Sequence, residues 1–95
     1  MGVREAKVEK YLDSEIQKLG GITRKWVCPQ RSGVPDRIVI IDGQVWFVEV
    51  KTDDGARSGV QVREHDRLKE AGASVITVYG EEGVDLFAGA LCQNS

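Results

Sequence analysis

The sequence lacks the features that mark secreted, membrane-bound and disulfide-stabilised proteins. Its 95 residues contain two cysteines, Cys28 and Cys92, which are too few and too far apart for a metal motif or a disulfide framework. No apolar run approaches the roughly 20 residues that cross a bilayer, and the N-terminus has no signal-peptide core. We therefore expect one domain over residues 1–95 that is cytoplasmic and neither secreted nor membrane-associated.

An excess of positive charge is also missing. The net charge is −2 and the pI is about 5.4, which does not suggest a nucleic-acid partner. Net charge is a weak test, however, where a site gathers carboxylates that a divalent cation would neutralise. Basic residues could still form a stripe facing phosphates: Arg24, Lys25, Arg31, Arg37, Arg57, Arg63 and Arg67. A scatter of solvated charge fits the same residues equally well, so composition leaves the function open.

Hydrophobic spacing and turn signals divide the chain into seven elements. We predict, in order, a helix over 3–19, a strand over 22–28, strands over 36–41 and 45–51, a helix over 58–71, a strand over 74–79 and a helix over 84–91. Gly20-Gly21 ends the first helix, and Ser58 with Gln61 resembles a capping box for the second. The order α-β-β-β-α-β-α indicates an α/β fold, with a mixed β-sheet flanked by helices.

The sharpest feature is the hairpin around Asp42-Gly43, a pair that favours a two-residue turn. Such a turn places Ile38 opposite Phe47 and Asp36 opposite Glu49. Alternation then puts one set of side chains on one face: Asp36, Ile38, Ile40, Val45, Phe47, Glu49 and Lys51. Opposed carboxylates about 5 Å apart repel each other, and a divalent cation with oxygen ligands would turn that repulsion into a site. Alternatively, both acids lie at solvated strand ends.

The first helix offers a third carboxylate. Glu5 falls near the centre of the apolar stripe formed by Val8, Leu12, Ile16 and Leu19, where an unpartnered acid is costly. If this helix packs on the apolar hairpin face described above, Glu5 could reach Asp36 and Glu49. Glu9, one turn further on, is the second candidate. Favourable placement of an acid in a first helical turn explains Glu5 equally well.

Three polar residues accompany these acids. Lys51 leaves its strand on the same side as Glu49, where a lysine could hold a nucleophilic water, deprotonate it as the neutral amine, or stabilise charge on a phosphate as the ammonium. A simple salt bridge to Glu49 is the alternative. Gln61 and His65 share a helix face and could orient substrate or water. For Gln61 the capping box is an equal alternative, and for His65 a buried, hydrogen-bonded ring is the more common outcome.

The pattern of an acid, a hairpin and Glu-x-Lys resembles the PD-(D/E)XK nuclease superfamily, with its restriction-endonuclease-like core. Within it, Gly33-Val34-Pro35-Asp36-Arg37 and Phe47-Val48-Glu49-Val50-Lys51, followed by Gln61, resemble the VRR-NUC family over essentially the whole chain. The resemblance implies Mg²⁺ or Mn²⁺ held by Asp36, Glu49 and the Val50 carbonyl, with Glu5 as a further ligand. It also implies hydrolysis of DNA phosphodiester bonds, in which Lys51 positions the attacking water and Gln61 completes the site.

Small stand-alone proteins that resemble this family are viral and bacterial, dimerise, and act on branched DNA such as four-way (Holliday) junctions. We therefore expect a homodimeric DNA repair endonuclease, although no interface is evident beyond the apolar surface of Trp26, Trp46 and Tyr79. Arg31, Arg37, Arg57 and His65 are the predicted DNA contacts. Two readings compete with the nuclease. One is a module with the nuclease fold that binds DNA without cutting it, and the other is a purely structural dimerisation domain.

Overall fold

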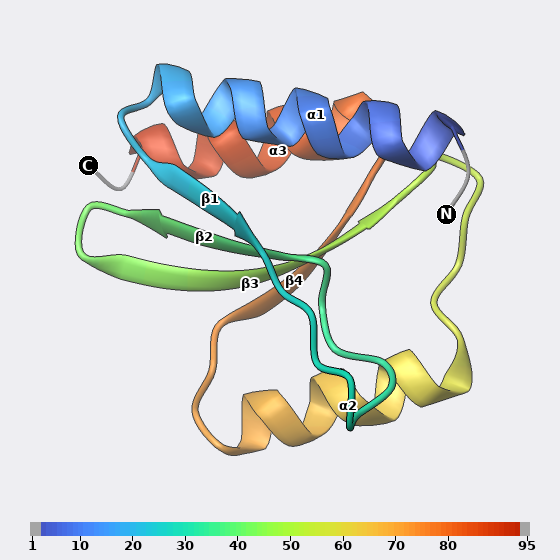
Figure 1. Ribbon diagram of the computed structural model, residues 1–95. Helices are drawn as coiled ribbons and strands as arrows, with labels where there is room; N and C mark the ends of the chain where they lie inside the picture. Colours follow the sequence, from blue (N-terminus) through green and yellow to red (C-terminus); the bar gives the residue numbers. More distant parts are fainter. Residues whose placement is uncertain (1–2, 94–95) are drawn as a thin grey trace.

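The computed structural model describes residues 3–93, which form a four-stranded sheet between helices (Figure 1). The elements in chain order are α1 (Val3–Lys18), β1 (Ile22–Lys25), β2 (Arg37–Ile41), β3 (Gln44–Lys51), α2 (Gly59–Glu70), β4 (Val75–Tyr79) and α3 (Gly80–Gln93). Helices α1 and α3 lie side by side over one face, and α2 lies on the other side of the sheet (Figure 1). Within residues 3–93, no helix combines the length and apolar character that a membrane span requires.

The sheet is mixed, as the element order predicts. Its strand order is β1-β2-β3-β4, with antiparallel pairing from β1 to β3 and parallel pairing of β3 with β4. The parallel pair needs a long crossover, which α2 supplies. The predicted α/β architecture is therefore confirmed.

The hairpin between β2 and β3 has the predicted register. Ile38 pairs with Phe47 and Ile41 pairs with Gln44, so the turn consists of Asp42 and Gly43. Both turn residues have positive φ, 51° and 76°, as a type I′ turn requires. Because this turn is set by local sequence, it aligns the two strands up to the functional end of the hairpin.

The packing of α1 differs from the prediction. We expected the helix on the face of Ile38 and Phe47, but the core lies on the opposite face. It joins residues from α1, both hairpin strands, β4 and α3: Val8, Leu12, Ile16, Val39, Ile41, Val48, Val50, Val78, Val84, Phe87 and Leu91. The hairpin is apolar on both faces, so alternation could not identify the one that α1 covers. The other face contacts α2 residues and, through Phe47, the ring of Trp26.

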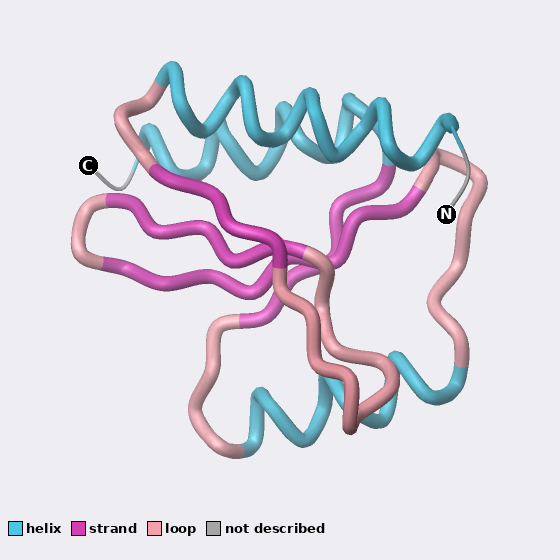
Figure 2. Tube along the Cα trace, viewed as in Figure 1, coloured by secondary structure: helices cyan, strands magenta, loops and turns pink. Residues whose placement is uncertain are grey.

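Two element boundaries also differ. Strand β1 ends at Lys25 rather than Cys28, since its partner β2 begins only at Arg37. The intervening loop leaves the sheet and reaches α2 (Figure 2), where Gly33 packs against the Val60 backbone. Helix α3 begins four residues earlier than expected. Gly80, with φ of 66°, allows the chain to pass directly from β4 into the helix.

Helix α2 begins as the sequence predicts. The Ser58 hydroxyl accepts a hydrogen bond from the Gln61 amide at 3.2 Å, and the Ser58 amide donates to the Gln61 side-chain oxygen at 2.9 Å. Both halves of the capping box are therefore present. This cap fixes the position of the Gln61 side chain as well as the start of the helix.

Candidate active site

Three carboxylates from separate elements meet at one end of the sheet. Asp36 directly precedes β2, Glu49 lies near the end of β3, and Glu5 lies in the first turn of α1. One oxygen of each carboxylate lies within 4.8 Å of the corresponding oxygens of the other two. The opposed acids predicted from the hairpin are thus joined by Glu5, although α1 covers the other face of the sheet.

Asp36 is held in place by the backbone. Its Oδ2 accepts a hydrogen bond from the Val50 N–H at 2.9 Å, and its carbonyl accepts one from the Trp26 N–H at 2.9 Å. These contacts direct the carboxylate toward β3 and Glu49. The Val50 carbonyl, which the family resemblance implies as a metal ligand, stays a prediction.

Glu49 is the most deeply buried of the three acids, with 1% of its surface exposed. Its Oε2 accepts a hydrogen bond from Gln61 Nε2 at 2.9 Å and lies 3.5 Å from Lys51 Nζ. Its Oε1 has no hydrogen-bond partner and lies 3.7 Å from His65 Nε2. Glu49 is therefore not an acid at a solvent-exposed strand end, which was the alternative that the sequence left open.

The surroundings of Glu49 oppose its ionisation. Burial, and then the nearby Asp36 carboxylate, raise the pKa of Glu49 to about 8, while the Lys51 ammonium acts in the opposite direction. A carboxyl placed in this way is a marker of a functional site, because a fold gains nothing from burying an acid beside another acid.

Gln61 forms the capping box and also donates a hydrogen bond to the carboxylate cluster. Its side-chain oxygen accepts from the Ser58 N–H, so its NH₂ group must face the other way, toward Glu49. The capping box therefore fixes the orientation of the amide that donates to Glu49. Lys51 has a side chain that is 16% exposed, which leaves its ammonium partly accessible at the rim of the site.

The structure assigns Glu9 and Arg37 to a separate, internal network. Arg37 lies 3.2 Å from a Glu9 carboxylate oxygen and 3.2 Å from one of Asp13, and its side chain is 14% exposed. Burial raises the pKa of Glu9, partly offset by the Arg37 charge. The helix-borne acid of the cluster is thus Glu5, and Arg37 faces α1 rather than the surface we expected it to share with DNA. Glu9 and Asp13 are four residues apart, so they lie on the same face of α1, and this spacing could have indicated a shared basic partner.

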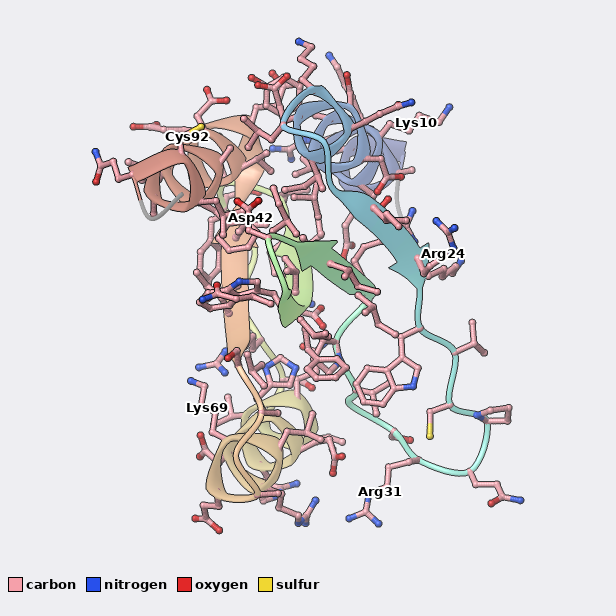
Figure 3. All side chains as sticks on the ribbon, turned by 90° about the vertical axis from the view of Figure 1, so that its left-hand side faces the viewer. Lys10, Arg24, Arg31, Asp42, Lys69 and Cys92 are labelled. Atoms are coloured by element: carbon pink, nitrogen blue, oxygen red, sulfur yellow. The ribbon has the colours of Figure 1, made fainter. Side chains whose placement is uncertain are left out.

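The other predicted DNA contacts lie around α2. Arg31, which is half exposed, extends from the β1–β2 loop to Glu64 at 3.0 Å (Figure 3). Arg57 is half-buried and lies 3.2 Å from His65 Nδ1. His65 itself has no exposed surface, so its ring is not available to a substrate. The sequence did not indicate the contact between Arg57 and His65.

The carboxylate cluster fits a divalent metal ion. Its donors are carboxylate oxygens, which Mg²⁺ and Mn²⁺ prefer. A buried oxygen without a hydrogen-bond partner, Glu49 Oε1, lies in the same cluster. Within residues 3–93, Lys51 is the one lysine or arginine that forms an ion pair with any of the three acids. A bound divalent ion would compensate the remaining negative charge.

Comparisons with known proteins identify the family. No family model matches the chain. It is 43% identical over 81 residues to "Putative nuclease p44" of Acyrthosiphon pisum secondary endosymbiont phage 1, which covers 84% of this chain and 87% of that protein. A solved structure described as a VRR-NUC domain superimposes with a TM-score of 0.79 at 36% identity, covering 88% of this chain and 92% of the other. The chain belongs to the VRR-NUC family of nucleases.

A more distant structure shares the fold of this VRR-NUC chain. It is Hjc of Archaeoglobus fulgidus, a Holliday junction resolvase from an archaeal hyperthermophile, with a TM-score of 0.60. Hjc is 18% identical and covers 79% of this chain and 67% of its own, so it supports the fold alone. The family and the fold that the sequence resemblance implied are confirmed for this VRR-NUC protein.

Proposed function

We propose that this VRR-NUC chain is a Mg²⁺- or Mn²⁺-dependent endonuclease that hydrolyses phosphodiester bonds in branched DNA, such as four-way junctions, and acts as a homodimer. The observation that carries the proposal is the group of three carboxylates from Glu5, Asp36 and Glu49, with the Lys51 ammonium beside Glu49. A purely structural domain has no use for this group, because its charges repel and one member is buried.

Each residue has a role that follows from its position. Glu5, Asp36, Glu49 and the Val50 carbonyl would hold the ion. When bound, the ion supplies Lewis acidity toward the scissile phosphate and lowers the pKa of its water. Lys51, at the rim, holds the attacking water or stabilises charge that develops on the phosphate. Gln61 keeps the Glu49 carboxylate in position through a hydrogen bond that the capping box orients.

Branched DNA is the proposed substrate for two reasons. The sequence motifs resemble those of small stand-alone VRR-NUC proteins that act on four-way junctions, and the p44 relative, of similar length, is named as a putative nuclease. Arg31 and Arg57 are proposed to contact phosphates on the α2 side of the site. In the described structure Arg31 shares Glu64 with Arg67, so two guanidinium groups surround one carboxylate and a net positive charge remains for the phosphate backbone.

A two-fold dimer suits a symmetric junction, because it presents two active sites to opposite strands. The surface that supports a dimer is an apolar groove of about 550 Å³ beside β4 and α3. Leu86 and Tyr79, which are 73% and 40% exposed, lie in its lining. Strand β4 is an edge strand of the sheet, and such edges are suited to pairing with a second chain.

The test uses synthetic four-way junctions, flaps and linear duplexes, each incubated with the protein and Mg²⁺, Mn²⁺ or EDTA. We expect metal-dependent cuts in the junction, paired on opposite strands, and a loss of rate by about 10²–10³-fold in Lys51→Ala. Lys10→Ala serves as the control. Lys10 is an exposed residue of α1 (Figure 3), so this variant should cut at the wild-type rate.

The alternatives give different results in the same assay. Binding of the junction without cutting under every metal condition would refute the catalytic proposal and favour a non-cutting DNA-binding module. Cuts that are unpaired, with single nicks accumulating before the second strand is cut, would contradict the dimer. Equal cutting of duplex and junction would contradict the preference for branched DNA.

A further inference from the structure

Two buried polar atoms face each other beside the carboxylate cluster without hydrogen-bond partners. They are Glu49 Oε1 and His65 Nε2, which lie 3.7 Å apart. Both residues are almost completely buried, with exposed fractions of 1% and 0%. Unpaired buried atoms of this kind are rare in folded proteins and call for an explanation.

We propose that His65 is a positioning residue whose Nε2–H is directed at Glu49 Oε1, to which it donates a hydrogen bond once the 3.7 Å separation shortens, and that Arg57 fixes the required tautomer. The proposal rests on the function proposed above, since it concerns a carboxylate that would hold the metal ion. His65 is fully buried, so it acts on the reaction through Glu49 and not through contact with DNA.

The tautomer follows from the chemistry of Arg57. Its Nη1 lies 3.2 Å from His65 Nδ1, and a guanidinium can only donate hydrogen bonds. Nδ1 must therefore accept, which leaves the proton of the neutral ring on Nε2, facing Glu49. Because Nδ1 accepts this hydrogen bond it carries no proton, so the ring beside Glu49 is neutral. Burial and the Arg57 charge, which lower the pKa of His65, act in the same direction.

The Glu49 carboxylate is then held from two sides. Gln61 Nε2 and Lys51 Nζ lie 2.9 and 3.5 Å from Oε2, and His65 Nε2 lies beside Oε1. Donors at both oxygens restrict rotation of the carboxylate about its terminal bond. Partners that orient a metal ligand in this way affect metal affinity strongly. Helix α2 thus supplies two positioning groups, four residues apart, to one carboxylate of β3.

The first test reads the tautomer directly. His65 is the only histidine in the sequence, so a long-range ¹H–¹⁵N NMR spectrum of the intact protein contains one imidazole. We expect a neutral ring protonated at Nε2, and a change to mixed tautomers in Arg57→Met. A ring protonated at Nδ1 in the wild-type protein would overturn the proposal, whether or not metal binds.

The second test measures Mn²⁺ affinity by calorimetry. His65→Leu removes the donor at similar volume, and we expect affinity to fall by about 10–100-fold. His65→Gln retains an N–H group that can reach Oε1, so its affinity should stay within about threefold of wild type. Both variants lose the native ring packing, so a merely structural role predicts equal changes in thermal stability and unchanged affinity in both.

The outcomes separate the two proposals. Wild-type protein that binds no Mn²⁺ would refute the metal-dependent function, and the NMR test of the pair between His65 and Glu49 would still apply. Wild-type binding that His65→Leu leaves unchanged would refute the positioning role alone. If His65→Leu fails to fold, Arg57→Met provides the second measurement, with a smaller loss of affinity expected.

Discussion

Glu49→Gln is expected to reduce DNA cleavage by about 10³-fold or more while the protein stays folded. Glutamine has the same shape, and its side-chain oxygen can accept from Gln61 Nε2 the hydrogen bond that Glu49 Oε2 accepts in the wild-type protein. It removes the negative charge at the centre of the carboxylate cluster, however, and with it the main buried ligand for a divalent ion. Loss of one charge-stabilising group alone costs about 10²–10³-fold, and loss of a metal ligand adds to it.

The measurement is single-turnover cleavage of a four-way junction at saturating Mn²⁺, with circular dichroism to verify folding. Glu15→Gln is the matched control, because Glu15 pairs with Lys18 near the other end of α1 and lies outside the cluster. It should cleave at the wild-type rate. A Glu49→Gln protein that cleaves within tenfold of wild type would place the catalytic site elsewhere.

The second large effect concerns stability, pH and metal together. The pKa of Glu49 in the folded protein is raised to about 8 from an ordinary value near 4.5. Between these values the folded state binds a proton that the unfolded state has released, so stability falls as pH rises, by at most about 1.4 kcal/mol per pH unit. The loss is absent below about pH 4.5 and complete above about pH 8.

Metal ions should reverse this trend, since they bind the ionised carboxylates. We expect the rise in melting temperature caused by Mg²⁺ to grow between pH 6.5 and pH 8.5. Glu49→Gln should show a flatter pH dependence without metal, and it should lose the Mg²⁺ shift. At pH 8.5, where Glu49 is ionised, Asp36→Asn should melt slightly higher than wild type without metal, because it removes the repulsion, and it should not respond to Mg²⁺.

Thermal unfolding across this pH range, with and without Mg²⁺, checks these expectations. His65, whose pKa is lowered in the fold, does not obscure the comparison, because wild type and Glu49→Gln both contain it. Wild type and Glu49→Gln that melt in parallel at every pH, with the same response to Mg²⁺, would show that Glu49 neither stays protonated in the fold nor binds the ion.

Local sequence was sufficient to predict the end of the hairpin at which Asp36 and Glu49 meet. The Asp42-Gly43 turn sets the pairing of the strands, so it also sets Asp36 against Glu49. The Ser58 and Gln61 capping box was predictable for the same reason, since its members are three residues apart. Both features depend on contacts between residues that are close in the chain, so the local sequence is enough to predict them.

Features that depend on the packing of distant elements were not predictable. Val39 and Ile41 alternate with Ile38 and Ile40, so either face of the hairpin could have received α1. Arg37 directly follows Asp36 in sequence, but its side chain turns toward α1, where it pairs with Glu9 and Asp13. The environment of His65 likewise depends on a loop that places Arg57 beside its ring.

The most direct test of the account is a titration of Mn²⁺ followed by electron paramagnetic resonance, in which the signal of the free ion disappears as the protein binds it. The wild-type protein and Asp36→Asn should be compared at pH 8, with Asp42→Asn, an exposed acid in the hairpin turn, as the control. We predict saturable binding by wild type and Asp42→Asn and its loss in Asp36→Asn. Equal binding by all three proteins would contradict a metal site built on Asp36, Glu49 and Glu5.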